Sequence, residues 1–82
     1  MISDWEIAGQ RVRRFETVLL PLARERTELA LAAYRGGRGD LGAVLEARRA
    51  GVETQLGQIA AELERARAWA RLNHLVLHEG KP

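Results

Sequence analysis

The hydrophobic positions fall into two long series that have the spacing of α-helices. In the first series, apolar residues recur at alternating intervals of three and four, with one polar interruption at Arg26. A sustained 3.5-residue repeat is typical of helices wound on one another. It predicts a helix over about residues 4–35 whose seam is Trp5, Ala8, Val12, Phe15, Leu19, Leu22, Arg26, Leu29 and Ala33.

The second series predicts a returning helix over about residues 41–77. Its heptad positions are Val52, Leu56, Ile59, Leu63, Ala66, Ala70, Asn73 and Leu77. The same segment is crowded with small residues, which let helix backbones approach closely: Ala43, Ala47, Ala50, Gly51, Gly57, Ala60 and Ala61. We expect helix packing to depend on Phe15, Leu19, Leu22, Leu29, Val52, Leu56, Ile59 and Leu63.

A glycine-rich turn at residues 36–40 separates the two helices. Gly36 or Gly37 can end the first helix in the left-handed conformation, because glycine has no Cβ penalty there. The carboxylate of Asp40 can accept the free N–H groups of the next helix. A link this short predicts an all-α fold: a long, coiled-coil-like antiparallel hairpin. Folded about Arg38, it would set Trp5 level with Trp69 and Phe15 against Ala60–Ala61.

Pro21 lies inside the first helix and predicts a kink nearby. Proline lacks the N–H group, and its ring clashes with the preceding turn. The helix should therefore bend or restart close to residue 20. At the other end of the chain the pattern stops after Leu77, and residues 78–82 are expected to form a frayed tail.

The composition predicts a single small domain that needs neighbours. The chain has 82 residues, of which 46% are apolar. Two helices side by side leave much of their apolar surface in water, so we expect self-association, most simply two hairpins in a four-helix bundle. With no cysteine, disulfides and thiolate metal sites are excluded. The net charge is only +2 and the arginines are spread along both arms, which does not favour nucleic-acid binding.

No arrangement of residues typical of an enzyme or of a cofactor site is visible. His74 and His78 have a spacing that can ligate a metal, but no third ligand accompanies them, so we favour two solvated histidines over a metal site. The only serine, Ser3, is placed to cap the first helix together with Glu6. We also expect no signal peptide and no membrane-spanning helix, because no stretch approaches 20 apolar residues.

Two arginine clusters, at residues 11–14 and 48–49, could bind phosphate groups. We favour pairing with acids instead, because Arg49 has Glu53 four residues on and Arg13 has Glu16 three residues on.

Segment 32–49 resembles the periplasmic hairpin signature of TolC-like outer-membrane efflux proteins. That signature is a tyrosine, a glycine three residues on, and then Leu-x-x-Val-Leu-(Asp/Glu)-Ala, which Tyr34, Gly37 and the segment 41–47 match. Segment 20–23 resembles the proline-marked segment before the hairpin. Segment 66–73 resembles the returning helix of the subgroup that serves heavy-metal efflux pumps, although His74 stands where members commonly have tyrosine.

The resemblance implies a non-enzymatic piece of a trimeric channel of the cell outer membrane, in its periplasmic part. Helices of this family form an export tunnel, and their hairpin tips dock onto a periplasmic adaptor of an inner-membrane pump. The implied docking tip is Tyr34, Gly36, Gly37, Gly39, Asp40, Leu41 and Val44. The family's barrel strands, first repeat and signal peptide are missing, so we expect a fragment. The alternative is a free-standing coiled-coil module that self-associates and binds an acidic partner through its arginines.

Overall fold

The chain folds into helices alone, as predicted. The computed structural model describes residues 2–79, with side chains for residues 4–74, and contains no strand in that part of the chain. Its elements are α1 (Ile2–Arg14), the π-helix η1 (Phe15–Leu19), α2 (Leu20–Arg35) and α3 (Leu41–Glu79). The bounds of α2 and α3 leave residues 36–40 for the turn.

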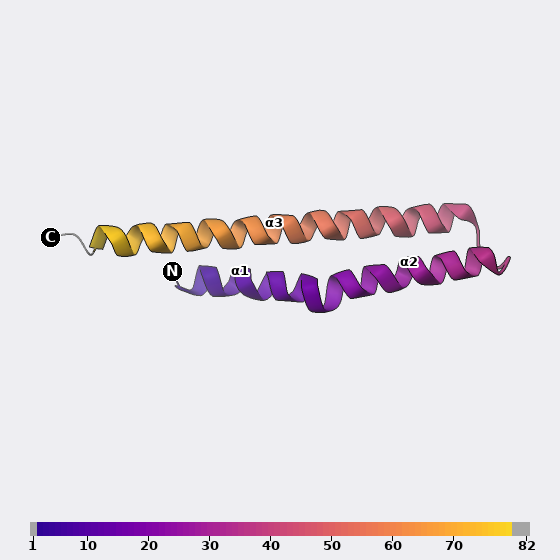
Figure 1. Ribbon diagram of the computed structural model, residues 1–82, viewed down its shortest axis with the longest axis horizontal. Helices are drawn as coiled ribbons and strands as arrows, with labels where there is room; N and C mark the ends of the chain where they lie inside the picture. The colour runs from indigo at the N-terminus through magenta and orange to yellow at the C-terminus, as the bar shows by residue number, and fades with distance from the viewer. Residues whose placement is uncertain (1, 80–82) are drawn as a thin grey trace.

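The two arms lie side by side, and α3 runs back along α2, η1 and α1 (Figure 1). At the end far from the turn, the rings of Trp5 and Trp69 are 5.7 Å apart between their centroids and tilted by 45°. The prediction that these two tryptophans lie at the same height along the hairpin is therefore confirmed. The molecule measures 71 × 16 × 11 Å between Cα atoms, so it is an extended strip that is one helix thick.

The contact between the arms is made mostly by small side chains. The buried hydrophobic residues of the described chain are Ala8, Val12, Val44, Ala61 and Ala68. Around them, α3 contributes half-buried residues of the predicted small set, such as Ala47, Gly51 and Gly57. Short side chains let the backbones approach closely, but they bury little apolar area, so this core is a small one.

Phe15 is half-buried between the arms, and its ring lies against Gly57. A Cβ atom added to Gly57 would come within 2.8 Å of Cζ of Phe15. The sequence predicted that Phe15 meets the Ala60–Ala61 region; the structure places its ring tip against Gly57, about one helical turn nearer the tip of the hairpin. The physical reason is the missing side chain at Gly57, which leaves the space that the ring fills.

The irregularity predicted near Pro21 is a π-helix just before the proline. Leu20 donates its N–H to the carbonyl of Phe15, five residues back, and Pro21 then stands in the first turn of α2. A wider turn accommodates a proline that cannot donate its own hydrogen bond. The ribbon of the first arm changes direction at this point (Figure 1).

We call the residues of each arm that face the other arm its inner seam. In the first arm, the π-helix shifts the inner seam by one residue. Up to the first residue of η1, the heptad positions Ala8, Val12 and Phe15 are buried or half-buried, as the heptad pattern predicts. After it, Ala23 and Thr27 are half-buried, while Leu22 and Arg26 are exposed. The prediction that the inner seam continues through Leu22, Arg26 and Leu29 is wrong, because one extra residue in the wide turn rotates the rest of the arm.

At its ends the chain departs slightly from the prediction. The first helix begins at Ile2, before Ser3, and the side chain of Ser3 lies outside the described residues. The last helix continues to Glu79, so His78 and Glu79 belong to it and not to a tail, and residues 80–82 lie outside the described part. Among the described helices, none has the length and apolarity to cross a membrane.

Candidate interaction surfaces at the tip and along the two outer edges

The turn at the tip is fixed by backbone hydrogen bonds. Gly37 has φ +74°, the left-handed conformation, and it follows Gly36, the last residue of the helix cap. Arg38 donates its N–H to Ala33 at 2.8 Å, and Gly37 donates to Tyr34 at 3.1 Å. These two bonds form a Schellman motif, in which a left-handed glycine ends a helix. Of the two glycines predicted for this role, the structure assigns it to Gly37.

Asp40 begins the returning helix as predicted. Its Oδ1 accepts the N–H of Ala43 at 2.8 Å, which satisfies one of the free donors of the first turn of α3. Gly39 is also constrained, since a Cβ atom there would lie 3.1 Å from the Cβ of Ala33. The backbone of the tip is therefore defined from Ala33 to Ala43.

Two large side chains are exposed at this tip. Tyr34 is 44% exposed and Leu41 is 52% exposed, one on each side of the turn. Val44 differs from the rest of the predicted tip set, because it is 4% exposed and lies between the arms. Its side chain holds the two arms together near the turn and is not part of the accessible surface. Tyr34 and Leu41 thus form the apolar surface of the tip.

A stripe of large apolar residues runs along the side of α3 that faces away from the first arm. Leu56 is two residues beyond the inward-facing Thr54, which places it about 200° further round the helix. We call this stripe the outer seam of α3. Its members are each 50–60% exposed: Leu45, Val52, Leu56, Ile59 and Leu63.

The first arm has an outer seam of its own. It consists of four large aliphatic residues that alternate along the helix with the inward-facing ones. Their side chains are 40–63% exposed: Ile7, Val18, Leu22 and Leu29. Of the eight residues predicted for helix packing, only Phe15 and Leu19 are half-buried. The other six belong to the two outer seams: Leu22, Leu29, Val52, Leu56, Ile59 and Leu63.

This division between inner and outer residues was not predicted from the sequence. The signal was present in α3, where Val44, Ala47, Gly51, Thr54, Gln58 and Ala61 also keep heptad spacing. A helix with two heptad series on opposite sides can pack against two neighbours at once. Each arm therefore carries an exposed apolar stripe in addition to the residues that contact the other arm.

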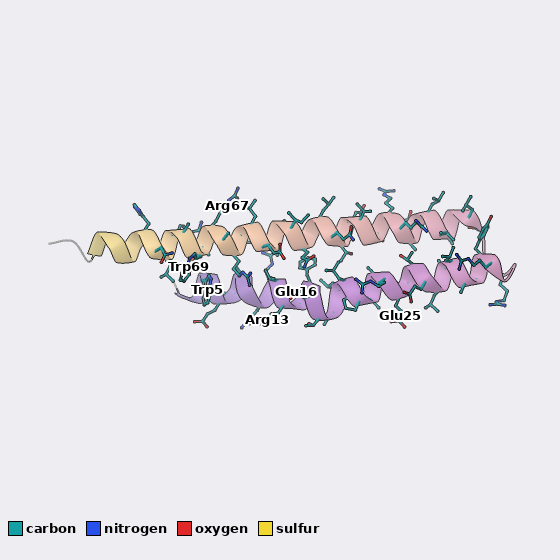
Figure 2. The ribbon with its side chains drawn as sticks, in the orientation of Figure 1. Trp5, Arg13, Glu16, Glu25, Arg67 and Trp69 are labelled. Carbon is teal, nitrogen blue, oxygen red and sulfur yellow. The ribbon has the colours of Figure 1, made fainter. Side chains whose placement is uncertain are left out.

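The charged residues are mostly exposed, with two ion pairs among the described residues. Arg11 on α1 pairs with Glu64 on α3, which joins the arms. The predicted pairing of Arg49 with Glu53 is confirmed, at 3.5 Å. The predicted pairing of Arg13 with Glu16 is not among these pairs. Figure 2 shows Glu25 on the side of α2 away from α3, and Arg67 on the side of α3 away from the first arm.

No group of three or more histidine, acidic or cysteine side chains gathers into a metal site within the described residues. His74 is exposed on α3, and the side chain of His78 lies outside the described part. The prediction for these two histidines therefore stays a prediction.

No protein-family model, no curated protein and no solved structure matches this chain.

Proposed function

We propose that this chain is an antiparallel helical hairpin that forms part of the wall of an export tunnel, as in a TolC-like outer-membrane efflux channel. The observation that carries the proposal is that each arm of an extended strip exposes an apolar stripe of its own. Helices that cover a stripe on each arm extend the strip into a layer one helix thick, and a curved layer of this kind is the wall of a tube.

In this proposal the neighbouring helices cover the two outer seams. Each large aliphatic side chain contributes about 1.5–3 kcal/mol when fully buried. The outer seams of α3 and the first arm together hold nine such residues. Neighbouring helices that cover these residues would add to the burial supplied by the inner contact, so assembly would stabilise the hairpin further.

The tip is the proposed docking site for a periplasmic adaptor protein, through which the channel joins an inner-membrane pump. Tyr34 and Leu41 supply exposed apolar surface, and the Schellman turn and the Asp40 cap hold the backbone that carries them. A preorganised backbone lowers the ordering cost of binding. The chain itself would be non-enzymatic and would need no cofactor, with a periplasmic location below the outer membrane. In this proposal the exported substrates are heavy-metal cations, as the sequence resemblance implies.

The docking proposal is tested by export through a chimeric channel. The described hairpin replaces the corresponding hairpin of a full-length TolC-like protein, and Tyr34→Arg and Leu41→Arg are introduced together. Gly37 and Asp40 stay, so the turn is preserved. The control carries Gln10→Arg and Gln55→Arg on the exposed shaft. We expect the control to export and the tip variant to fail; normal export by the tip variant would contradict docking.

The second candidate is a free-standing module that self-associates and binds an acidic partner. It is favoured by the arginines that flank the groove between the arms, such as Arg24 and Arg48. The two proposals differ in genetic setting, because a channel piece should be encoded beside a pump and an adaptor. They also differ in binding, since an acidic partner held by arginines would be released steeply by salt.

A further inference from the structure

We infer that the open end of the hairpin, far from the tip, holds a binding site for a small aromatic carboxylate. The site is built by Trp5 and Arg13 on α1 and by Arg65 on α3. It needs only the two arms of one chain, so it does not depend on the export tunnel, and either one can fail without the other.

An opening of about 230 Å³ lies between the arms at this end. Its lining consists of Trp5, Glu6, Gly9, Gln10, Arg13 and Arg65. Sites for drug-sized ligands measure roughly 300–1,000 Å³. This smaller opening therefore suits a molecule with a single ring.

Two arginine side chains from different arms converge over Gly9. A Cβ atom added to Gly9 would lie 3.7 Å from Nη1 of Arg13 and 3.9 Å from Cδ of Arg65. Neither arginine belongs to an ion pair within the described part of the chain, although Glu16 and Glu62 each stand three residues away on the same helix. The planar guanidinium group matches the geometry of a carboxylate. The two arginines therefore offer a carboxylate binding groups that no ion pair occupies.

The indole of Trp5 gives the same opening an aromatic wall. The ring of Trp69 is 5.7 Å away between centroids, and Figure 2 shows both tryptophans between α1 and α3. Aromatic rings at this separation attract one another, so Trp69 holds the ring of Trp5 in place. Trp5 stays 38% exposed, which leaves part of its ring free to contact a ligand. An aromatic ring attached to the carboxylate can pack there.

Glu6 determines the charge of the ligand that fits. It lines the opening together with Arg13 and Arg65, so two positive charges and one negative charge surround the ligand. A ligand with one negative charge balances this set. A phosphate group carries about −1.5 to −2 charges at neutral pH and is repelled more strongly by Glu6. The site therefore favours a carboxylate over a phosphate.

Tryptophan fluorescence reports binding directly, because Trp5 and Trp69 are the only tryptophans of the chain. The full chain is titrated with benzoate, which has one aromatic ring and one carboxylate. We expect a saturable change in emission with a Kd on the order of 1 mM. Cyclohexanecarboxylate, which lacks the aromatic ring, should bind about two- to tenfold more weakly. Inorganic phosphate should give no saturable change.

Charge variants locate the site on folded protein. Arg13→Gln and Arg65→Gln should each weaken benzoate binding about tenfold, because a hydrogen-bonded charge is lost. Both positions are exposed, and circular dichroism checks that the helices remain. Glu6→Gln should tighten binding about two- to fivefold, since it removes the repelling carboxylate. The matched control, Arg24→Gln with Arg48→Gln, removes two arginines from another opening between the arms, whose lining has no aromatic residue. It should leave binding unchanged.

Three results would overturn the inference. One is a titration in which benzoate gives no saturable response. The second is benzoate binding that Arg13→Gln and Arg65→Gln leave unchanged, or that the control variant weakens equally. The third is equal binding of benzoate and phosphate, which would exclude an aromatic carboxylate as the preferred ligand. None of these results bears on export, which the chimeric channel tests separately.

Discussion

Cζ of Phe15 lies where it would be only 2.8 Å from a Cβ atom on Gly57, so these two residues fit only while position 57 is glycine. Non-bonded carbon atoms prefer 3.5–4.0 Å, so a side chain at this position has to displace the ring. Glycine inside a helix lowers helix stability, and close packing of the ring offsets that loss.

Gly57→Ala should therefore destabilise the hairpin although alanine favours helix. Overpacking costs roughly 1–3 kcal/mol and the gain in propensity is about 1 kcal/mol, so we expect a net loss of about 1 kcal/mol. Gly51→Ala is the matched control, because its Cβ would lie 4.0 Å from Oγ1 of Thr27. The control should stabilise the protein by about 0.5–1 kcal/mol. Urea unfolding followed by circular dichroism measures both, and equal effects would contradict this packing.

The register shift at η1 predicts opposite behaviour for two adjacent residues of α2. Ala23→Glu places a carboxylate between the arms and should lower the free energy of unfolding by about 1–2 kcal/mol. Leu22→Glu changes an exposed position and should alter it by no more than about 0.5 kcal/mol at concentrations where the chain is monomeric. If Leu22→Glu were the more damaging change, the seam would follow the unbroken heptad.

The left-handed glycine of the turn predicts another contrast. Gly37→Ala should cost about 1 kcal/mol, because an L-residue is strained at φ +74°. Gly36→Ala should cost much less, since Gly36 has φ −83° and a Cβ there meets only the flexible end of Arg38. Thermal unfolding of the two single variants decides this; a larger loss for Gly36→Ala would argue against the Schellman turn.

The cap at Asp40 predicts a loss that depends on the side-chain oxygen. Asp40→Ala should destabilise the protein by about 1 kcal/mol, because the N–H of Ala43 loses its acceptor. Asp40→Asn keeps an acceptor and should stay close to the wild-type stability. Equal losses for both variants in urea unfolding would show that charge, and not the hydrogen bond, is what Asp40 contributes.

The sequence predicted the turn because its signals are local. Glycine in the left-handed region and aspartate at a helix start have the same effect in almost any surroundings, so Gly37 and Asp40 could be assigned without the fold. The level of Trp5 and Trp69 then followed from the position of the turn. Placing the two tryptophans at the same height needs only the position of the turn and the number of residues in each arm.

The register of α2 and the assignment of inner and outer faces could not be obtained in the same way. The five residues of η1, Phe-Glu-Thr-Val-Leu, include neither glycine nor proline, and Pro21 indicates an irregularity without showing that it adds a residue to one turn. In α3, both the large and the small series keep heptad spacing, and apolar size alone favours the wrong one for the inner contact. The small series forms the inner contact because short side chains let the two helix backbones come closer together.

Sedimentation of the wild-type chain over a wide range of concentrations tests the central claim most directly, namely that two apolar outer seams require neighbours. We predict helical species heavier than the 9.2 kDa monomer, which grow with concentration and dissociate on dilution. A fully helical 9.2 kDa monomer at high concentration would contradict the claim.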